Sequence, residues 1–331
     1  MKTTGIATGQ LLCVGIHGQT LSSGERRALR KLVPGAVILF KRNYESAAQV
    51  TELCAQIRQA SEVPPLIAVD QEGGRVVRFG APFMKLEAAR TLARSRTPGQ
   101  VYDLARAMAR ELRQAGVDIV FAPVLDVVTN RYNQAIGERA FGATAARVIR
   151  YGVAFMRGLA SGGIVPCPKH FPGHGSIRED SHVELPVSSA TPQSLFGVHI
   201  KPFVAAIEAG APMIMMAHVM VAAIDAARPA SMSARMIGGV LRERLGFKAV
   251  VATDDLQMQA LKGLGDIDER AAIALEAGAD MLLVCREIEA VESAFDVIRR
   301  MADGPAMRPA VAASMQRIAK LRRYARIIGA R

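Results

Sequence analysis

The hydrophobic residues of this chain lie in short, unbroken runs that alternate with longer segments of helical periodicity. Continuous apolar runs are typical of parallel strands that are covered on both faces, because neither row of side chains meets water. Eight such runs occur along the chain. These predicted strands are Leu11–Ile16, Gly35–Phe40, Leu66–Val69, Ile119–Ala122, Ile164–Cys167, Met213–Met216, Ala249–Ala252 and Met281–Val284.

Each predicted strand is followed by a segment whose apolar residues return at the spacing of a helix. One of these segments is preceded by Thr191 and Pro192, an N-cap followed by proline in the first turn. Several end in a glycine just before the next strand, for example Gly116 and Gly246, which is typical of a helix C-terminus. The predicted helices are Gly24–Val33, Ala47–Ala60, Val101–Ala115, Ala145–Ala160, Gln193–Ala209, Ser233–Leu245, Glu269–Ala277 and Ile288–Met301.

Eight strand-then-helix units in roughly 300 residues predict an α/β fold, the (β/α)₈ TIM barrel. The alternative is a doubly wound open sheet, which usually carries a Gly-x-Gly-x-x-Gly turn after a strand. The segment Cys13–Gly18 does not have this pattern. No linker rich in proline, glycine or serine interrupts the chain, so we expect one domain over residues 1–331.

Composition indicates a globular protein, since 50% of the 331 residues are hydrophobic and 22% are charged. No apolar run approaches the roughly 20 residues of a membrane span, and residues 1–15 do not have the pattern of a signal peptide. We therefore expect a cytoplasmic protein without a membrane partner. The scattered cysteines Cys13, Cys54, Cys167 and Cys285 form no Cys-x-x-Cys pair and agree with a reducing compartment.

The net charge of +12 raises the question of a nucleic-acid partner. Part of the excess lies on a predicted C-terminal amphipathic helix at about 309–328, which includes Arg317, Lys320, Arg322, Arg323 and Arg326. No zinc-finger, helix-turn-helix or RNP pattern accompanies it, which favours a solvated basic face over a polynucleotide site. We expect no nucleic-acid partner, although a basic surface could help to attract an anionic small substrate.

Polar residues collect where the predicted strands end, which is where a barrel enzyme carries its active site. Helix N-caps would explain one or two of them, but not a Lys-His pair together with an Asp-Asp pair. The sequence therefore predicts an active site at this end of the barrel. These residues are Asp70, Asp126, Lys169, His170, His218, Asp254 and Asp255.

The segment Lys169–His182 combines three histidines with a lysine, an arginine and two acids. Its proline and glycines exclude a regular helix or an interior strand, so we interpret it as a reactive loop. In extended backbone, Asp180 and His182 project to the same side, and the carboxylate could orient the imidazole and keep it protonated near neutral pH. A surface histidine beside a chance acid would give the same spacing.

Carboxylates at two other strand ends suggest sugar chemistry. Asp70, followed by glycines and by Arg78, could accept hydrogen bonds from two adjacent hydroxyl groups. In the pair Asp254-Asp255, one side chain is expected to face the mouth and the other to pack or cap. A carboxylate there could act as a nucleophile, but spacing does not decide which of the two does so.

A catalytic metal is a less favoured interpretation. The histidines His170, His174, His182 and His218 could bind one. However, no His-x-His pattern follows the first strand, and the spacing from 170 to 174 spans a Pro-Gly turn instead of a helix. We therefore expect no metal.

Eight short motifs follow one another along most of the chain. They are Ala68–Val76, Phe121–Asp126, Ala135–Arg139, Lys169–Gly175, Asp180–His182, Ala217-His218, Arg228–Ser231 and Thr253–Leu256. In order and spacing they resemble the bacterial β-N-acetylhexosaminidases of glycoside hydrolase family 3, of the cytoplasmic single-domain type that acts in peptidoglycan recycling. The resemblance covers roughly residues 10–290 and implies a (β/α)₈ barrel, in agreement with the strand pattern.

The resemblance also implies roles for individual residues. Asp254 would be the nucleophile that forms a covalent glycosyl-enzyme. His182, paired with Asp180, would be the general acid/base, instead of the second carboxylate that most retaining glycosidases use. The residues that would bind the non-reducing N-acetylglucosamine are Asp70, Arg78, Arg139, Lys169 and His170.

The implied reaction is removal of terminal N-acetylglucosamine, with retention, from GlcNAc-β-1,4-anhydroMurNAc peptides or chitobiose-like sugars. The resemblance implies no metal or organic cofactor, and we expect a monomer. Three alternatives remain open on sequence grounds. The protein could be a phosphorylase in which phosphate replaces water, a metal-dependent hydrolase, or a non-catalytic sugar-binding protein; the presence of both Asp254 and His182 favours an enzyme over the last.

Overall fold

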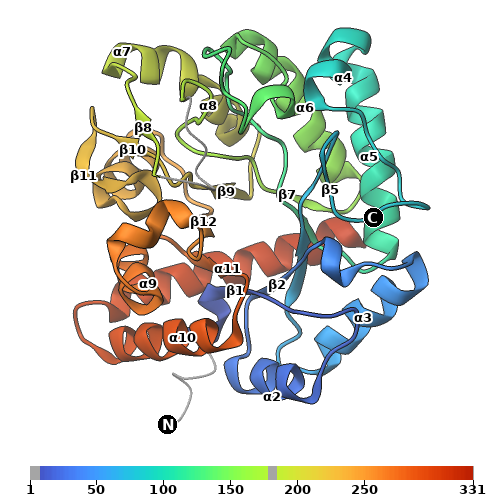
Figure 1. The fold of residues 1–331 in the computed structure, drawn as a ribbon, viewed down its shortest axis with the longest axis vertical. Helices are drawn as coiled ribbons and strands as arrows, with labels where there is room; N and C mark the ends of the chain where they lie inside the picture. The colour runs from blue at the N-terminus through green and yellow to red at the C-terminus, as the bar shows by residue number, and fades with distance from the viewer. Residues whose placement is uncertain (1–7, 178–184, 331) are drawn as a thin grey trace.

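The protein is an eight-stranded parallel barrel surrounded by helices, as seen in a computed structural model that describes residues 8–177 and 185–330 (Figure 1). All strand pairs of the barrel are parallel. The (β/α)₈ fold class predicted from the apolar runs is confirmed. The barrel strands are β1 (Leu12–Gly15), β2 (Ala36–Leu39), β3 (Leu66–Val69), β6 (Ile119–Val120), β7 (Val165–Pro166), β9 (Met213–Met215), β12 (Val250–Asp255) and β13 (Met281–Val284).

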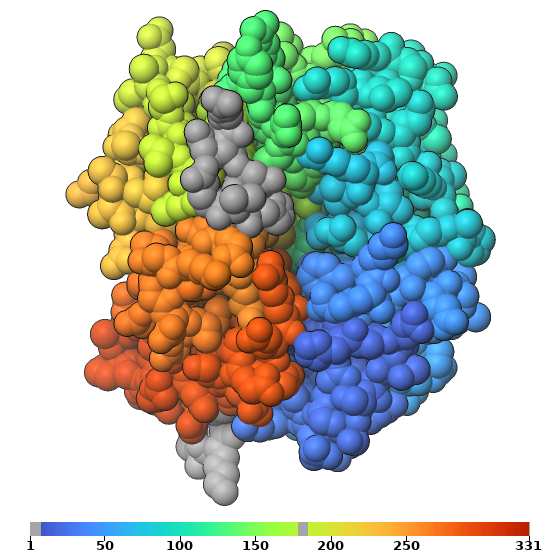
Figure 2. Space-filling view, in the orientation of Figure 1, coloured from blue at the N-terminus to red at the C-terminus, as the bar shows by residue number. Residues whose placement is uncertain are grey.

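The barrel closes between the segment that follows β7 and the end of β9. Phe171 N–H donates to Met215 O at 2.8 Å, and Met215 N–H donates to Pro168 O at 3.0 Å. On the other side of the barrel, β1 pairs with β13, so the first and last barrel strands are neighbours in the sheet. Figure 2 shows the same neighbourhood from outside, where the blue N-terminal and orange C-terminal segments meet on one face.

The helices predicted from periodicity are present, with two changes in geometry. The segment predicted as one helix over 193–209 is divided into α7 (Pro192–Ser194), a π-helical turn η4 (Leu195–His199) and α8 (Lys201–Glu208). Pro202 has no N–H to donate to the preceding turn, and the π-helical turn ends just before it. The segment η6 (Arg235–Arg244) is also π-helical.

The remaining helices lie around the strands or at their ends. The long ones are α2 (Ser23–Leu32), α3 (Ala47–Gln59), α4 (Ala89–Ser95), α5 (Pro98–Gln114), α6 (Ala145–Ser161), α9 (Ile267–Glu276), α10 (Ile288–Asp303) and α11 (Arg308–Gly329). The short 3₁₀ turns are η1 (Gly9–Leu11), η2 (Lys41–Asn43), η3 (Gly137–Arg139), η5 (Ala230–Met232) and η7 (Gln259–Leu264). None of the helices in the described ranges is long and apolar enough to cross a membrane.

Two small sheets that the apolar pattern did not predict lie beyond the carboxyl ends of the barrel strands. One is the hairpin of β4 (Gln71–Gly73) and β5 (Val76–Val77), and the other contains β8 (Val187–Ser188), β10 (Met220–Val221) and β11 (Asp225–Pro229). They are too short to give a periodic signal. In the β4–β5 hairpin, Gly73 and Gly74 have φ of 101° and 56°, a region that favours glycine, and a Cβ on Gly74 would lie 2.8 Å from Ala88.

Helix α11 covers the opposite end of the barrel, where the strands begin. Its Ser314 and Arg317 donate to Asp280 Oδ1 at 2.7 and 2.8 Å. The other carboxylate oxygen of Asp280 accepts from Arg242 at 2.5 Å and from the Val251 N–H at 2.8 Å. Asp280 is fully buried just before β13, so this carboxylate ties α11 and η6 to the sheet.

Replacing Asp280 with asparagine is expected to lower the free energy of unfolding by about 3–5 kcal/mol, because two arginines lose their buried counter-charge. Urea denaturation at pH 7 measures the change. The matched control is Asp103→Asn, which removes an exposed carboxylate paired with Arg106 and is expected to cost less than about 1 kcal/mol. Equal effects of the two variants would show that Asp280 does not anchor α11.

Candidate active site

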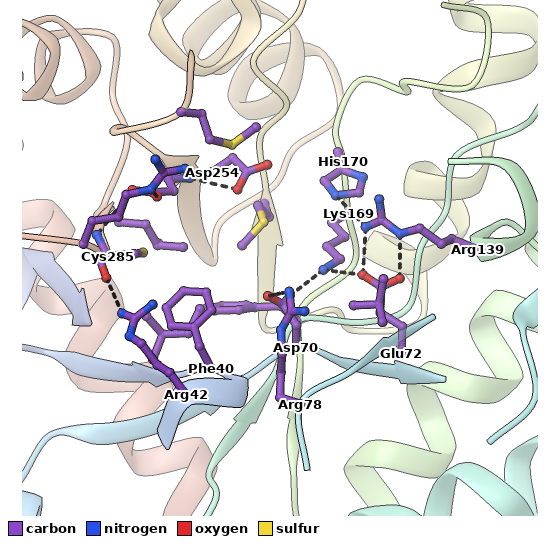
Figure 3. Close-up of a pocket in the computed structure, with 18 residues that line it drawn as sticks. Phe40, Arg42, Asp70, Glu72, Arg78, Arg139, Lys169, His170, Asp254 and Cys285 are labelled. Atoms are coloured by element: carbon purple, nitrogen blue, oxygen red, sulfur yellow. Dashed lines mark hydrogen bonds and ion pairs between the residues drawn. The ribbon is translucent and has the colours of Figure 1, made fainter. Parts of the chain in front are cut away.

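A cavity of about 340 Å³ opens at the carboxyl ends of the barrel strands (Figure 3). Charged groups of both signs line its walls, and apolar side chains fill in between them. Six residues predicted from the sequence as catalytic or substrate-binding line this one cavity. They are Asp70, Arg78, Arg139, Lys169, His170 and Asp254.

A buried lysine forms the centre of the charged wall. Lys169 Nζ lies 2.7 Å from Asp70 Oδ1 and 2.7 Å from Glu72 Oε1, and the Lys169 side chain is only 3% exposed. Burial alone would lower the pKa of Lys169, but the two carboxylates raise it above the usual range. Burial alone would raise the pKa of Asp70, but Lys169 and Arg78 lower it. Lys169 and Asp70 are therefore both charged at neutral pH.

Glu72 also forms a two-pronged ion pair with Arg139. The Nε and Nη2 atoms of Arg139 lie 2.8 Å from the two oxygens of Glu72, and both side chains are nearly buried. Burial opposes ionisation of Glu72, but Lys169 and Arg139 hold its pKa well below the usual range. Sequence reasoning did not select Glu72, although it lies within the Asp70–Arg78 segment on β4. Only the hairpin geometry turns it toward Lys169.

His170 is oriented by a buried aspartate. His170 Nδ1 lies 2.8 Å from Asp126 Oδ2, and Asp126 is fully buried. The other oxygen of Asp126 accepts from the His174 backbone N–H at 2.6 Å. Burial would raise the pKa of Asp126, but His170 and these hydrogen bonds lower it. An ionised Asp126 leaves His170 Nε2 facing Arg139 Nη2 at 3.4 Å.

The two aspartates at the end of β12 have different environments. Asp254 Oδ1 accepts the backbone N–H of Asp255 at 2.8 Å. Burial would raise the pKa of Asp254, but nearby His218 and His170, together with that hydrogen bond, lower it. Asp254 is therefore ionised at neutral pH. It lines both the main cavity and the small hollow beside His174 and His218.

Asp255 caps the turn after β12 instead. Its Oδ1 accepts the N–H groups of Gln257 at 3.1 Å and Cys285 at 3.3 Å, and its Oδ2 lies 3.7 Å from Arg286 Nε. Burial, together with the neighbouring Asp254, raises the pKa of Asp255 to about 6. The spacing in the sequence left open which of the two aspartates could act as a nucleophile. The two environments favour Asp254, because the pKa of its carboxyl is lowered whereas that of Asp255 is raised.

His218 supports the same region from behind. Its Nε2 lies 3.0 Å from the Asp255 carbonyl oxygen, which can only accept, so Nε2 carries the proton. Its Nδ1 then accepts from the Ser231 hydroxyl at 2.7 Å. Burial lowers the pKa of His218, so the ring is neutral. The two ring nitrogens of His218 thus link Ser231 of η5 to the end of β12.

Phe40 separates two arginines on the remaining wall. The guanidinium of Arg42 lies 4.6 Å from the ring centroid of Phe40, and that of Arg78 lies 5.9 Å from it. Arg42 also donates to the carbonyl oxygens of Ile16 and Cys285, both at 2.9 Å. Figure 3 shows Arg42 and Cys285 on the side of the cavity opposite Lys169. Sequence reasoning did not select Phe40 or Arg42, because neither belongs to a polar motif.

Two predicted catalytic residues, Asp180 and His182, lie outside the described residues. The preceding part of the same loop is described. His174 is buried, and its carbonyl oxygen accepts from Asn133 Nδ2 at 2.7 Å. Together with its N–H bond to Asp126, this contact makes His174 a residue that stabilises the turn.

Cys13, Cys54, Cys167 and Cys285 are buried free thiols, and burial raises the pKa of each. Within residues 8–177 and 185–330, histidine, cysteine and acidic side chains form no group of three or more that could hold a metal ion. The described part of the cavity presents an ionised carboxylate, Asp254, and a wall of fixed hydrogen-bond donors and acceptors.

Comparisons with known proteins identify relatives over most of the chain. Residues 5–321 match the family described as "Glycosyl hydrolase family 3 N terminal domain". A Beta-hexosaminidase of Xylella fastidiosa (strain M23) is 42% identical over 281 residues, which are 83% of each chain. One of Stenotrophomonas maltophilia (strain K279a) is 40% identical over 295 residues, or 87% of each chain.

Solved structures show the same likeness. The β-N-acetylglucosaminidase of Paenibacillus sp. str. FPU-7 is 34% identical with a TM-score of 0.94, over 99% of this chain and 63% of that one. NagZ from Neisseria gonorrhoeae, solved with N-trifluoroacetyl-D-glucosamine, is 31% identical with a TM-score of 0.80, over 94% of this chain and 98% of that one. The chain described here belongs to glycoside hydrolase family 3 and is a glycoside hydrolase.

Proposed function

We propose that this protein is a retaining exo-β-N-acetylglucosaminidase that removes non-reducing terminal N-acetylglucosamine from muropeptide fragments, GlcNAc-β-1,4-anhydroMurNAc peptides, in cell-wall recycling. The observation that carries the proposal is the ionised Asp254 carboxylate at a cavity whose opposite wall holds Lys169 between Asp70 and Glu72. Such a wall suits the hydroxyl groups of one terminal sugar.

The choice of sugar rests on the wall chemistry and on the relatives. Asp70 is partly exposed and can accept hydrogen bonds from two adjacent hydroxyl groups, while Lys169 and Arg139 offer donors and His170 offers a ring nitrogen beside it. Because Glu72 and Asp126 fix these groups, little reorganisation is needed when a sugar binds. The relatives named Beta-hexosaminidase and the Neisseria enzyme solved with a glucosamine derivative support N-acetylglucosamine as that sugar.

The proposed reaction has two steps. Protonated His182 donates its proton to the glycosidic oxygen while Asp254 forms a bond to the anomeric carbon, and the bond to the aglycone breaks. Neutral His182 then takes a proton from water, whose oxygen attacks the anomeric carbon and releases Asp254. Two inversions give retention of configuration. The assignment of His182 and Asp180 rests on their motif in the sequence and on the family.

The setting of the reaction is part of the proposal. We infer that the protein acts in the cytoplasm as a monomer with one barrel domain, and that its small-molecule substrates arrive there as soluble wall fragments. The family membership supports this inference, and the mouth of the described barrel offers a pocket for one terminal sugar instead of a long groove for a polymer.

The direct test is release of chromophore from an aryl β-N-acetylglucosaminide, with the corresponding aryl β-glucoside as control. We expect efficient release from the first and little from the second, and the anhydromuramyl disaccharide peptide should lose its terminal N-acetylglucosamine. In phosphate buffer the product should be free sugar. A product that is mainly sugar 1-phosphate would identify a phosphorylase and contradict the hydrolytic assignment.

Two variants assign the chemistry. Asp254→Asn and His182→Ala are each expected to reduce turnover by at least about a thousandfold, with unchanged thermal unfolding, because each removes a group that acts in the transition state. Asp103→Asn, far from the cavity on α5, serves as the control and should retain normal turnover. Near-normal turnover of either test variant would remove that residue from the mechanism.

The raised pKa of Asp255, about 6, predicts a pH-dependent effect on stability. Because the folded state favours the protonated carboxyl, its ionised form costs free energy above pH 6 that is absent below the unfolded pKa of about 4. Asp255→Asn should therefore raise the free energy of unfolding at pH 8, by up to about 3 kcal/mol. At pH 4 the gain should shrink strongly.

Urea denaturation of the unchanged protein and of Asp255→Asn, each at pH 8 and at pH 4, measures this difference. The control Asp103→Asn should change the free energy of unfolding by the same small amount at both pH values. A loss of stability in Asp255→Asn that is larger at pH 8 than at pH 4 would mean that the ionised carboxylate is stabilised by Arg286 and that burial does not dominate.

A further inference from the structure

A second cavity, of about 650 Å³, lies at the end of the barrel opposite the active site. Leu66, the first residue of β3, and Asp118, just before β6, lie on its wall, whereas Asp70 of the active site follows the other end of β3. Five arginines and one acid line it, so the wall carries a net charge of +4. They are Arg58, Arg113, Arg322, Arg323 and Arg326, with Asp118.

Asp118, the single acidic residue that lines this cavity, is already paired with two arginines. Asp118 Oδ2 accepts from Arg58 Nη2 at 2.7 Å and from the Ile67 N–H at 2.9 Å, while Oδ1 contacts Arg113 Nη1. Asp118 is buried, as expected for a carboxylate that joins two helices to the sheet. Its charge therefore balances Arg58 and Arg113 in part and leaves the arginines of α11 without a counter-charge.

Asp280 has a position similar to that of Asp118, but α11 contacts its carboxylate. Asp280 follows a glycine by two residues, as Asp118 follows Gly116, and it also accepts a backbone N–H of the neighbouring strand. At Asp280, however, Ser314 and Arg317 of α11 reach the carboxylate and fill the space. At Asp118 no side chain of α11 is bonded to the carboxylate, and a cavity is present.

The three arginines that α11 contributes differ in their contacts. Arg322 donates to Pro64 O at 2.6 Å and to Gly35 O at 3.4 Å. Burial, together with the nearby Arg326, lowers the pKa of Arg322. Arg323 and Arg326 are exposed and form no hydrogen bond or ion pair with the described part of the chain. Like charges held this close repel one another, and an anion between them would relieve the repulsion.

A solvated basic helix face is the simplest interpretation of α11, but it does not explain two observations. The arginines come from α3, α5 and α11 and meet around one hollow, instead of spreading over one helix. The hollow also has an apolar side formed by Pro64, Pro65, Ala319 and Ala325. Convergent cations beside an apolar wall are features of a small-molecule site, and the volume is in the usual range for one.

We propose that this cavity binds a small molecule that carries two or more linked phosphate groups. Arginine suits this ligand, because its planar guanidinium can donate two parallel hydrogen bonds to one phosphate. A charge of +4 exceeds what a single carboxylate or monophosphate would balance. The apolar wall leaves room for an organic body attached to the phosphates.

Isothermal titration of the full-length protein with tripolyphosphate, and separately with ATP, tests the proposal. The test variant is R323E/R326E, which changes two exposed side chains without internal bonds. The control variant is R150E/R157E, which makes the same charge change on two exposed arginines of α6. Both variants should keep the thermal unfolding and glycosidase turnover of the unchanged protein, because neither pair lies at the active site.

We expect both probes to bind the unchanged protein, and R323E/R326E to weaken binding at least tenfold while R150E/R157E changes it less than threefold. Tighter binding of ATP than of tripolyphosphate would show that the apolar wall contacts the organic body. Equal binding of the two probes would show that linked phosphates are sufficient. Either result supports the site. Absence of binding, or equal weakening in both variants, would overturn it. Tighter binding of a single-stranded oligonucleotide through the same arginines would overturn the small-molecule assignment.

Discussion

The active site depends on one buried cation, Lys169, held between the carboxylates of Asp70 and Glu72. A buried charge is costly unless it is paired and hydrogen-bonded, so these three groups must lie together for any of them to remain charged. The barrel supplies this condition, because Asp70 follows β3, Glu72 lies in the next hairpin and Lys169 follows β7. The positions of these cavity-lining groups are therefore set by the fold before any ligand binds.

The same constraint extends across the cavity to Asp254. Arg139 pairs with Glu72, His170 pairs with Asp126, and the positive charge of Lys169 helps to lower the pKa of Asp254. Neutral His218 holds the end of β12 from behind. A carboxylate that is ionised and fixed opposite preorganised donors is suited to attack a carbon that becomes positively charged in the transition state. The opposite end of the barrel shows how buried carboxylates instead serve stability, since Asp280 joins α11 to the sheet.

Much of this architecture could be predicted from the sequence. The apolar runs gave the eight strands because parallel strands covered on both faces must be apolar throughout, and the barrel then placed Asp70, Lys169 and Asp254 at one end. Asp126 was also placed at this end, but the roles of Glu72 and Asp126 could not be assigned, because they depend on a hairpin turn and on contacts with His170 and the His174 N–H. Spacing alone did not decide between Asp254 and Asp255, since adjacent positions have equal access in sequence. The structure adds that the two carboxylates differ in their hydrogen-bond partners and in the direction of their pKa shifts. The length of α7 and α8 was misjudged where Pro202 interrupts the helical ladder.

The proposed mechanism requires Asp254 to form a covalent bond to the sugar. A fluorinated N-acetylglucosaminyl fluoride that forms the glycosyl-enzyme quickly but hydrolyses slowly would trap it, and mass spectrometry of the digested protein would locate the sugar. We expect one added sugar on the peptide 249–262, and fragmentation should place it on Asp254. The Asp254→Asn variant should carry no added sugar. A sugar on Asp255 or on another peptide, or turnover with no trapped sugar, would contradict it.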